Sequence, residues 1–386
     1  MIYLNGLEAV SALGGDRNEA VLAIRNNCSR AFRTIPGYLP GDIAADLGTV
    51  TCPLNAPGDT DSRTGRLAAH CINLSRDMIT AAIRHYGPDR VGLVLGTSTS
   101  AISEVEQEGR ILMARGERLS FDSRIYEVAT ITDFLKKMLG LRGPCYTVAT
   151  ACSSSARALI SALELINAGI CDAVITGGAD SLSAVSVSGF YSLGALSPGH
   201  ARPFHRERDG ISIGEGAGIA LAAREKLEPR ALKFLGYGAT SDAHHISAPD
   251  PSGKMPAAAM RKALDMSELD PGDIGYLNLH GTGTRLNDAM EGRAVYEVFG
   301  NRVPTSSVKH LAGHTLGAAG ITGAYVASLV LDGVPLPRHD YRPEEFREEF
   351  PELDLVTASE RYAERPYVMV NSFAFGGNNV SMVFGK

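Results

Sequence analysis

The chain has 386 residues, of which 44% are hydrophobic and 21% charged, and its formal net charge is −6. This composition is typical of a globular protein with a real core, and the net charge argues against general binding to nucleic acid or anionic lipid. No run approaches the roughly 18 apolar residues of a membrane span, and residues 1–14 lack the features of a signal peptide. We therefore expect a cytoplasmic protein built as two domains or one large unit.

Five short apolar runs predict buried strands, and Ala-rich amphipathic runs of helical length lie between them. The predicted strands are Val91–Leu95, Pro144–Val148, Ala173–Thr176, Ile274–Leu279 and Tyr367–Val370. This alternation indicates an α/β fold in which helices cover the sheets.

Two pairs of similar segments indicate that the chain consists of two related halves. The strand and Gly-Thr-x-Thr turn of 91–99 resemble those of 274–284, and the strand–turn–helix unit of 146–169 resembles that of 307–333. We place the join near Glu225–Arg230, which gives an N-terminal half of 1–225 and a C-terminal half of 226–386.

Cys152 is the one cysteine of six whose surroundings suggest chemistry. A predicted strand leads into it, and apolar residues follow at helical spacing, among them Ala156, Leu159 and Leu163. Such a strand-to-helix corner projects the side chain outward, and the free N–H groups of the helix start favour a thiolate. The alternative is a buried core cysteine, and the residues alone leave both interpretations open.

Two histidines stand at the ends of predicted elements, and His280 lies at the C-terminal end of a strand, where ligands gather in α/β folds. His280 follows a predicted strand and begins a Gly-Thr-Gly-Thr turn, in which glycines permit close backbone approach and Thr282 and Thr284 offer hydroxyls. His314 precedes an Ala-rich helix, and Lys309 lies five residues before it. Because a lone histidine is more often structural, position alone does not assign either one a role.

Asp288 and Glu291 share one face of the helix expected after this turn. A lysine near Glu291, such as Lys309, would form a charge-assisted pair with it and hold the loop. The pair His244-His245 has no cysteine or carboxylate cluster at ligand spacing around it, so we expect no metal site.

Together these segments resemble the β-ketoacyl-acyl carrier protein synthases of the thiolase superfamily, over almost the whole chain. The matching motifs stand in the family's order: Ala149-Thr-Ala-Cys152, Arg202-Pro-Phe…Arg208-Asp-Gly…Gly214-Glu-Gly-Ala-Gly218, Ser241-Asp-Ala-His-His…Ala248-Pro-Asp-Pro251, His280-Gly-Thr-Gly-Thr284, Lys309…Gly313-His314…Gly317-Ala-Ala-Gly320 and Asn371-Ser-Phe-Ala-Phe-Gly-Gly377. The resemblance implies a five-layered αβαβα fold of two similar halves. It also implies a dimer formed across sheet edges near Gly143–Val148.

The resemblance also implies roles for individual residues. They are the nucleophile Cys152, the catalytic histidines His280 and His314, the supporting pair Lys309 and Glu291, the pantetheine-holding hydroxyls of Thr282 and Thr284, and Phe375, a gating aromatic whose backbone N–H completes an oxyanion hole with that of Cys152. Arg63 and Arg66, one helical turn apart, are our candidates for docking an acidic carrier protein.

The implied reaction is a decarboxylative Claisen condensation. An acyl group moves from a carrier-protein thioester to Cys152, malonyl carrier protein loses CO₂, and the resulting carbanion attacks the acyl group while His280 and His314 donate to the enolate oxygen. The resemblance implies no cofactor beyond the phosphopantetheine of the acyl carrier protein. It implies a homodimer, or a heterodimer with a chain-length factor.

The chain departs from the family's usual pattern at Ser153–Ser155, His205, Ala374 and Asn378, which flank the acyl pocket or its gate. These departures bear on the choice of acyl chain and leave the reaction unchanged. The compact chain and its Met1-Ile-Tyr start resemble the ketosynthases of aryl polyene pathways. The alternatives are a non-catalytic chain-length factor, which usually lacks the nucleophile, and a CoA-dependent thiolase-like condensing enzyme.

Overall fold

The structure is a computed structural model that describes residues 1–29, 31–56, 62–117, 127–340, 349–357 and 359–386. Ten of its described strands form one sheet, in the order β10-β9-β11-β12-β8-β1-β7-β6-β4-β5. The strands of its N-terminal half are β1 (Ile2–Val10), β4 (Val91–Gly96), β5 (Cys145–Val148), β6 (Ala173–Asp180) and β7 (Gly216–Ala223). Those of its C-terminal half are β8 (Leu232–Ser241), β9 (Ile274–Asn278), β10 (Thr305–Ser306), β11 (Tyr367–Ala374) and β12 (Asn378–Gly385).

The two halves of this sheet have the same topology. When the strands are numbered in chain order within each half, both halves have the order 1-5-4-2-3 from the centre of the sheet to its edge. In both, strand 5 pairs antiparallel with strands 1 and 4, and strand 2 pairs parallel with strands 3 and 4. The pairs of similar segments correspond to this repeat, because β4 and β9 occupy equivalent places, as do β5 and β10. The predicted join lies in the connection from β7 to β8, and β1 pairs with both of these strands.

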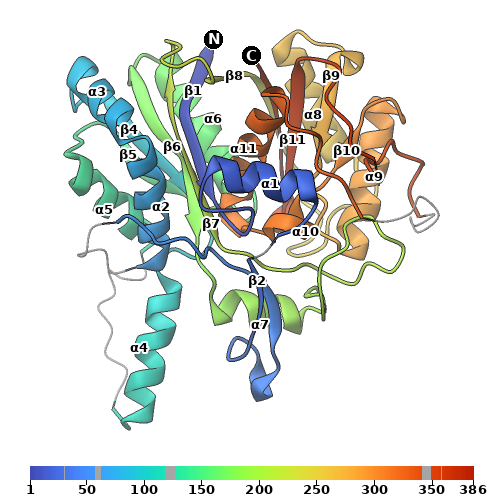
Figure 1. The fold of residues 1–386 in the computed structure, drawn as a ribbon, viewed down its shortest axis with the longest axis horizontal. Coiled ribbons are helices and arrows are strands. Elements are labelled where there is room, and N and C mark those ends of the chain that lie inside the picture. The colour runs from blue at the N-terminus through green and yellow to red at the C-terminus, as the bar shows by residue number, and fades with distance from the viewer. Residues whose placement is uncertain (30, 57–61, 118–126, 341–348, 358) are drawn as a thin grey trace.

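Helices cover and separate the two halves of the sheet. They are α1 (Arg17–Asn26), α2 (Arg63–Leu74), α3 (Arg76–Tyr86), α4 (Ile102–Ala114), α5 (Thr130–Leu139), α6 (Ser154–Asn167), α7 (Ala184–Ser192), α8 (Lys254–Ser267), α9 (Arg285–Phe299), α10 (Lys309–Ala312) and α11 (Ala319–Leu331). Buried residues of α6 and α11 form one hydrophobic core with residues from strands of both halves, so these two helices lie between the halves of the sheet. Others place α2, α3 and α5 outside the N-terminal strands and α8 and α9 outside the C-terminal strands (Figure 1). This is the layered thiolase-like fold expected from the sequence.

The central helices α6 and α11 approach each other closely because glycine faces the contact. A Cβ on Gly320 would lie 2.6 Å from the backbone N of Ala156, so no larger residue fits there without a shift. Residues Gly320–Val330 of α11 are all buried, which explains why this helix is apolar on every side. The packing places the start of α6, next to Cys152, beside the start of α11, close after His314.

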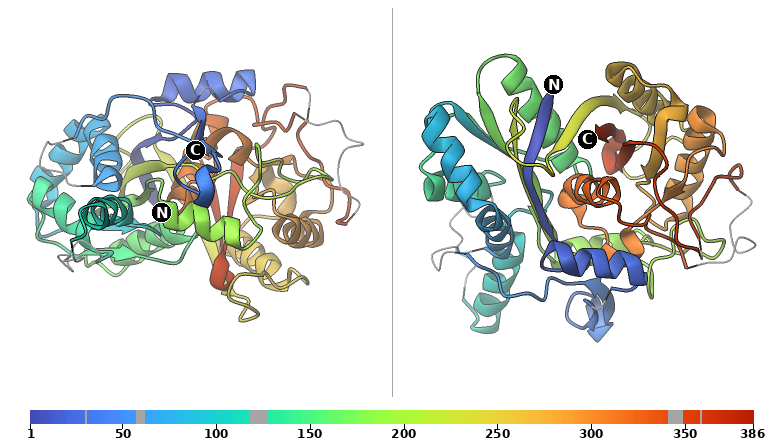
Figure 2. Two further views of the ribbon diagram at one scale, coloured as in Figure 1. Left: turned by 90° about the horizontal axis from the view of Figure 1, so that it is seen from below. Right: turned by 45° about the horizontal axis from the view of Figure 1, so that its top comes forward.

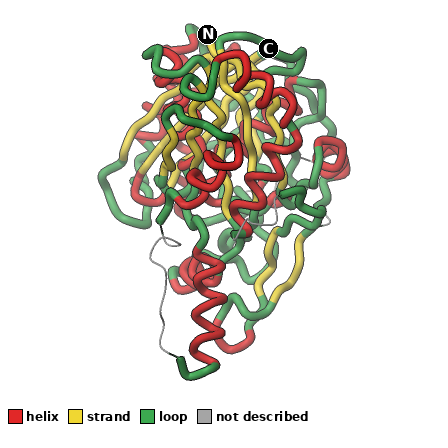
Figure 3. Tube along the Cα trace, turned by 90° about the vertical axis from the view of Figure 1, so that its left-hand side faces the viewer, coloured by secondary structure: helices red, strands yellow, loops and turns green. Residues whose placement is uncertain are grey.

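Several elements extend from the layered body at the end opposite the chain termini. They are α4, α7 and the hairpin of β2 (Phe32–Ile35) and β3 (Ala45–Gly48) (Figure 3). The two termini lie close together (Figures 1 and 2), because β1 and β12 both pair with the beginning of β8.

All five strands predicted from apolar runs are strands here: β4, β5, β6, β9 and β11. Strand β5 is the last of the large sheet and pairs with β4 alone among the described strands. Its outer edge is the segment that the family resemblance marks as a dimer interface.

Candidate active site

Cys152 lies at the corner between β5 and α6, as the sequence predicts. Its predecessor Ala151 has a left-handed φ of 51°, and α6 begins two residues after the cysteine. The side chain is only 5% exposed, and the backbone N–H groups of Phe375 and of Cys152 itself act to lower the pKa of its thiol. These two N–H groups are the pair expected to form an oxyanion hole.

The expectation that Cys152 has a lowered pKa is wrong for the resting protein. Burial raises the pKa of the Cys152 thiol to about 12, and the nearby charge of Asp180 adds to the rise. Lys309 and the two backbone N–H groups act in the opposite direction, but desolvation of the thiolate outweighs them. The sulfur therefore rests as a thiol and needs a proton acceptor when it reacts.

A nitrogen that could accept this proton lies next to the sulfur. The Nε2 atom of His314 is 3.0 Å from Sγ of Cys152, and the rings of His280 and His314 meet edge to face with centroids 5.4 Å apart. One nitrogen from each histidine and the sulfur all lie within 4.8 Å of one another. Burial lowers the pKa of both imidazoles well below the usual value, and the charge of Lys309 lowers it further. Both rings are therefore neutral at physiological pH.

No neighbour holds the Nδ1 side of either imidazole in the part of the chain that the structure describes. Within the described part of the chain, the Nδ1 atoms of His280 and His314 have no hydrogen-bond partner. Metal-bound histidines normally fix this nitrogen with an acceptor, so the arrangement suits proton exchange better than a resident metal ion.

The expected ion pair between Lys309 and Glu291 does not form. Among the described residues no contact within 4.0 Å joins them, and both instead hold the backbone of His280. Nζ of Lys309 donates to the carbonyl oxygen of His280, while Glu291 accepts from the N–H groups of His280 at 2.7 Å and Gly281 at 2.7 Å. Asn371 adds a third hydrogen bond to Glu291, at 3.2 Å. Lys309 and Glu291 both bind the backbone of His280. They therefore support this residue together without contacting each other.

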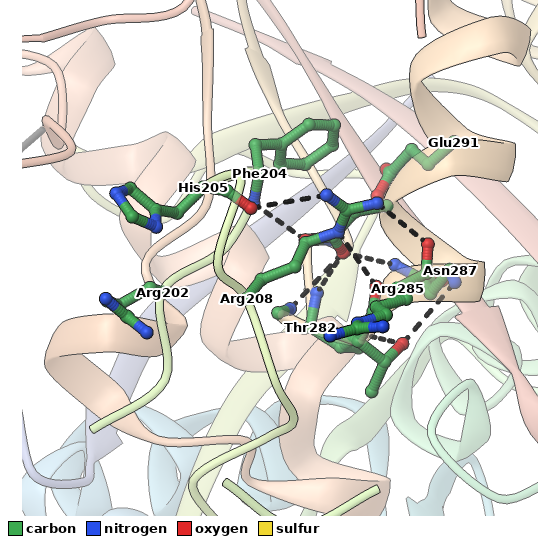
Figure 4. Close-up of polar contacts among 12 residues, drawn as sticks. Arg202, Phe204, His205, Arg208, Thr282, Arg285, Asn287 and Glu291 are labelled. Carbon is green, nitrogen blue, oxygen red and sulfur yellow. Dashed lines mark hydrogen bonds and ion pairs between the residues drawn. The ribbon is translucent and has the colours of Figure 1, made fainter. Parts of the chain in front are cut away.

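A second buried pair supports the same turn, and sequence reasoning gave neither member a role. The carboxylate of Asp288 accepts from the N–H groups of Thr282 at 3.1 Å, Gly283 at 3.2 Å and Phe204 at 2.7 Å. Fully buried Arg208 lies 3.7 Å from this carboxylate and donates to the carbonyl of Arg285 at 2.9 Å (Figure 4). The motif Arg208-Asp-Gly was visible in the sequence. Only the folded structure shows that the Arg208 side chain is buried and binds the first residue of α9.

A cavity of about 480 Å³ opens onto the three reactive side chains. Thr282 and Thr284 line it, with their hydroxyl oxygens 3.0 Å apart, and the hydroxyl of Thr284 also caps α9. Phe375 lines it too and packs on Phe190 of α7, with ring centroids 5.3 Å apart. The cavity thus brings together the residues expected to bind pantetheine, to gate the site and to react.

The two candidate docking arginines differ in their surroundings. Both line a second hollow, of about 600 Å³, between α2, α4 and the β2–β3 hairpin. The guanidinium of Arg63 makes paired hydrogen bonds of 2.7 and 2.5 Å with the carboxylate of Glu215, whereas Arg66 is exposed. The structure therefore leaves Arg66 more accessible to an acidic partner than Arg63.

In the described residues, no helix combines the length and the apolar character needed to cross a membrane. All six cysteines are free.

Comparison with known protein families gives two matches that lie side by side along the chain. The family described as "Beta-ketoacyl synthase, N-terminal domain" matches residues 77–227, and "Beta-ketoacyl synthase, C-terminal domain" matches residues 233–339. Two full-length relatives carry the name 3-oxoacyl-[acyl-carrier-protein] synthase 2. The one from Staphylococcus aureus is 32% identical over 99% of this chain and 100% of its own length. The one from Synechocystis sp. is 34% identical over 100% and 98%.

Solved structures show the same fold over the full length. One chain of the complex of the ketosynthase ApeO with its chain length factor ApeC, from Xenorhabdus doucetiae, superposes with a TM-score of 0.94 and 38% identity, covering 100% of this chain and 97% of that one. A chain of the ishigamide ketosynthase/chain length factor gives a TM-score of 0.89 and 27% identity, over 100% and 98%.

Proposed function

We propose that this chain, which belongs to the β-ketoacyl synthase family, joins malonyl carrier protein to an acyl group held as a thioester on Cys152. The reaction is a decarboxylative Claisen condensation. The observation that carries the proposal is the 3.0 Å contact between Sγ of Cys152 and Nε2 of His314, with His280 beside them in one cavity.

Loading of the acyl group uses the cysteine, its oxyanion hole and one histidine. As Sγ of Cys152 attacks the thioester carbon, Nε2 of His314 takes the thiol proton. The backbone N–H groups of Cys152 and Phe375 stabilise the negative oxygen of the tetrahedral intermediate. The carbon–sulfur bond to the carrier then breaks, and the proton passes from His314 to the departing pantetheine thiolate.

Condensation uses both histidines as neutral donors. Loss of CO₂ from the malonyl group leaves two electrons on the α-carbon, and the enolate oxygen accepts hydrogen bonds from His280 and His314. The carbanion attacks the acyl carbon on Cys152, the bond to Sγ breaks, and the sulfur takes up a proton. The reaction leaves CO₂ and a β-ketoacyl carrier protein. Because the site is buried, these hydrogen bonds are stronger than they would be in water.

We assign the pantetheine arm to the hydroxyls of Thr282 and Thr284, which face the cavity. Phe375 is the gating aromatic, held by its contact with Phe190. Docking of the acidic acyl carrier protein is assigned chiefly to Arg66 on α2, because Glu215 already occupies Arg63. The carrier's phosphopantetheine is the only prosthetic group that the reaction uses.

The intact set of Cys152, His280 and His314 favours catalysis over the alternative of a chain-length factor, which usually lacks the nucleophile. The same two histidines disfavour a CoA-dependent thiolase-like enzyme, since those relatives usually differ at one of these positions.

We further propose that the chain acts in an aryl polyene pathway together with a chain-length-factor partner. The support is its likeness to a chain of the ApeO–ApeC complex, at 38% identity. The outer edge of β5, which pairs with β4 alone among the described strands, is the surface assigned to that partner. Six free cysteines suit a reducing compartment, so we assign the protein to the cytoplasm.

The test combines intact-mass measurement with a reconstituted reaction. After incubation with acyl carrier protein, the chain should gain the mass of the acyl group, and the Cys152→Ala variant should gain none. Addition of malonyl carrier protein should then release CO₂ and a β-ketoacyl carrier protein. Acylation of the Cys152→Ala variant, or CO₂ release without a β-keto product from wild type, would refute the assignment.

A further inference from the structure

Asp180 is a buried carboxylate at the end of β6 that the reaction as described does not use. It is 0% exposed, and it accepts hydrogen bonds from five donors. They are Oγ1 of Thr97 at 2.6 Å, the N–H of Ser98 at 2.9 Å, the N–H and Oγ1 of Thr99 at 2.9 and 2.8 Å, and the N–H of Gly317 at 2.6 Å. Burial raises the pKa of this carboxyl, while the hydrogen bonds from Thr97, Ser98 and Thr99 favour its ionised form.

These donors come from two loops in different halves of the chain. Residues 97–99 follow β4, and Oγ of Ser98 donates in turn to the carbonyl of Ala151, the residue before Cys152, at 3.1 Å. Gly317 lies in the short turn of 316–318, three residues after His314. One carboxylate therefore ties the turn beside the nucleophile to the loop that carries its proton acceptor.

The backbone beside each of these contacts has unfavourable φ angles, both next to the loops and in the turn before Cys152. Ala151, Ser100 and Leu316 have left-handed φ angles of 51°, 49° and 48°, which are unfavourable for residues with a Cβ. Strain of this kind persists only where the surroundings hold it, and it gathers at functional sites. A Cβ on Gly317 would lie 2.6 Å from Oδ2 of Asp180, so the loop could not sit this close with a larger residue.

We propose that Asp180 is a positioning residue for the condensation, which holds the sulfur of Cys152 and the imidazole of His314 in contact. It does so by anchoring the loop of 97–99, which bonds to the turn before Cys152, and the turn that follows His314. This inference rests on the proposed function. The hydrogen bonds made by Asp180 cross from one half of the chain to the other, so they set the distance between groups that no single strand or helix carries together.

The charge of Asp180 also acts on the nucleophile. After burial, this carboxylate is among the causes that raise the pKa of the Cys152 thiol. Removing the charge without changing the shape should therefore lower that pKa, and the thiol should react with iodoacetamide at lower pH than in wild type. If Asp180 had a purely structural role, the pH dependence of the reaction with iodoacetamide would not change.

The test compares two variants. In Asp180→Asn, the amide oxygen can keep the three residues that donate to Oδ1, but its NH₂ then faces the N–H of Gly317 and loses that hydrogen bond. Gly317→Ala keeps the charge and pushes the carboxylate away from the loop. Both variants should lower the kcat of condensation about 10- to 100-fold, with KM for the carrier unchanged, as expected for one unsatisfied buried donor.

The alkylation profile separates the two variants. We expect the pH midpoint for reaction of Cys152 to fall in Asp180→Asn and to stay at the wild-type value in Gly317→Ala. The control is Asp172→Asn, which removes a surface carboxylate paired with Arg90 and should change neither readout. If Asp180→Asn does not fold, the kcat of Gly317→Ala decides alone.

Condensation within twofold of wild type in folded Asp180→Asn or Gly317→Ala would overturn the inference, as would a rise in KM with unchanged kcat. These outcomes differ from failure of the proposed function, in which wild-type protein itself would form no β-ketoacyl product in the same assay.

Discussion

At the scale of single residues, burial decides the charge of each reactive group. It raises the pKa of the Cys152 thiol to about 12 and lowers the pKa of His280 and His314 well below the usual value. The site is therefore neutral at rest, with a thiol and two uncharged imidazoles. A neutral site suits malonate chemistry, because a protonated imidazole would hold the carboxylate that must leave as CO₂. The 3.0 Å contact with sulfur is the reason for which we propose that His314 takes part in loading.

Replacing the two histidines separately should divide the reaction into its steps. We expect His314→Ala to slow both acyl loading and condensation, because this imidazole contacts Sγ. His280→Ala should leave loading near the wild-type rate and lower condensation about 100-fold or more, as expected for loss of an oxyanion donor. Rapid-quench measurement of acyl-Cys152 and of β-keto product checks this. Equal loss of loading in both variants would contradict the division.

The residues that we propose to react were easier to predict from the sequence than the residues that hold them in place. Cys152, His280 and His314 stand next to predicted strand and helix ends, so pattern and resemblance together identify them. Asp180, Arg208 and Asp288 act through contacts with residues distant in the chain, and their burial is visible only in the folded protein. The same limit explains the two corrections, since neither desolvation of Cys152 nor the competing backbone partners of Lys309 can be read from spacing.

At the scale of helices and strands, apolar runs predicted β4, β5, β6, β9 and β11 and missed other strands that are as deeply buried. Strand β7 escaped because Gly216–Ala223 contains only small residues and two larger aliphatic ones, although every residue in it is buried. Strand β10 has two residues, which is too short for any periodicity. The repeat was found because β4 and β9 each run into a Gly-Thr-x-Thr turn. Their equivalent place in the sheet required the strand pairings.

Helix α2 contains both candidate docking arginines, and the structure separates their expected effects. We expect Arg66→Glu to raise KM for the acyl carrier protein severalfold with kcat unchanged, because this side chain is exposed and free to meet an acidic partner. Arg63→Glu should instead destabilise the fold by about 1–3 kcal/mol, because it leaves Glu215 buried without its partner. Steady-state kinetics and thermal denaturation of both variants check this. An unchanged KM in Arg66→Glu would remove α2 from the docking surface.

At the scale of the whole molecule, the two halves meet at a central pair of helices, and β5 is the last strand at one end of the sheet in the described part of the chain. Tyr146 on this strand is 37% exposed. We expect Tyr146→Lys to weaken association with the partner chain at least tenfold, because it places a charge at the edge assigned to sheet extension. Size-exclusion chromatography with light scattering over a concentration series measures this. An unchanged association state would place the interface elsewhere.

Acid stability is a property of the whole fold that follows from its buried histidines. His310 is buried, and its Nε2 is 3.1 Å from Oδ1 of Asn27. Burial, with a smaller effect from His200, lowers the pKa of His310 to about 4. In the unfolded chain a histidine titrates near 6.5. Between these values the unfolded state binds a proton that the folded state does not, so folding free energy is lost as the pH falls.

The size of this effect is testable with a neutral replacement. With pKa values of about 4 folded and about 6.5 unfolded, His310 alone destabilises the fold by about 2 kcal/mol on going from pH 7.5 to pH 5. His310→Gln retains a donor for Asn27 and cannot titrate. Its melting temperature should therefore fall less than that of wild type over this range, while condensation at pH 7.5 stays unchanged. Parallel melting curves for the two proteins from pH 7.5 to 5 would show instead that His310 is protonated in the folded state, and that the buried side of α10 is open to water.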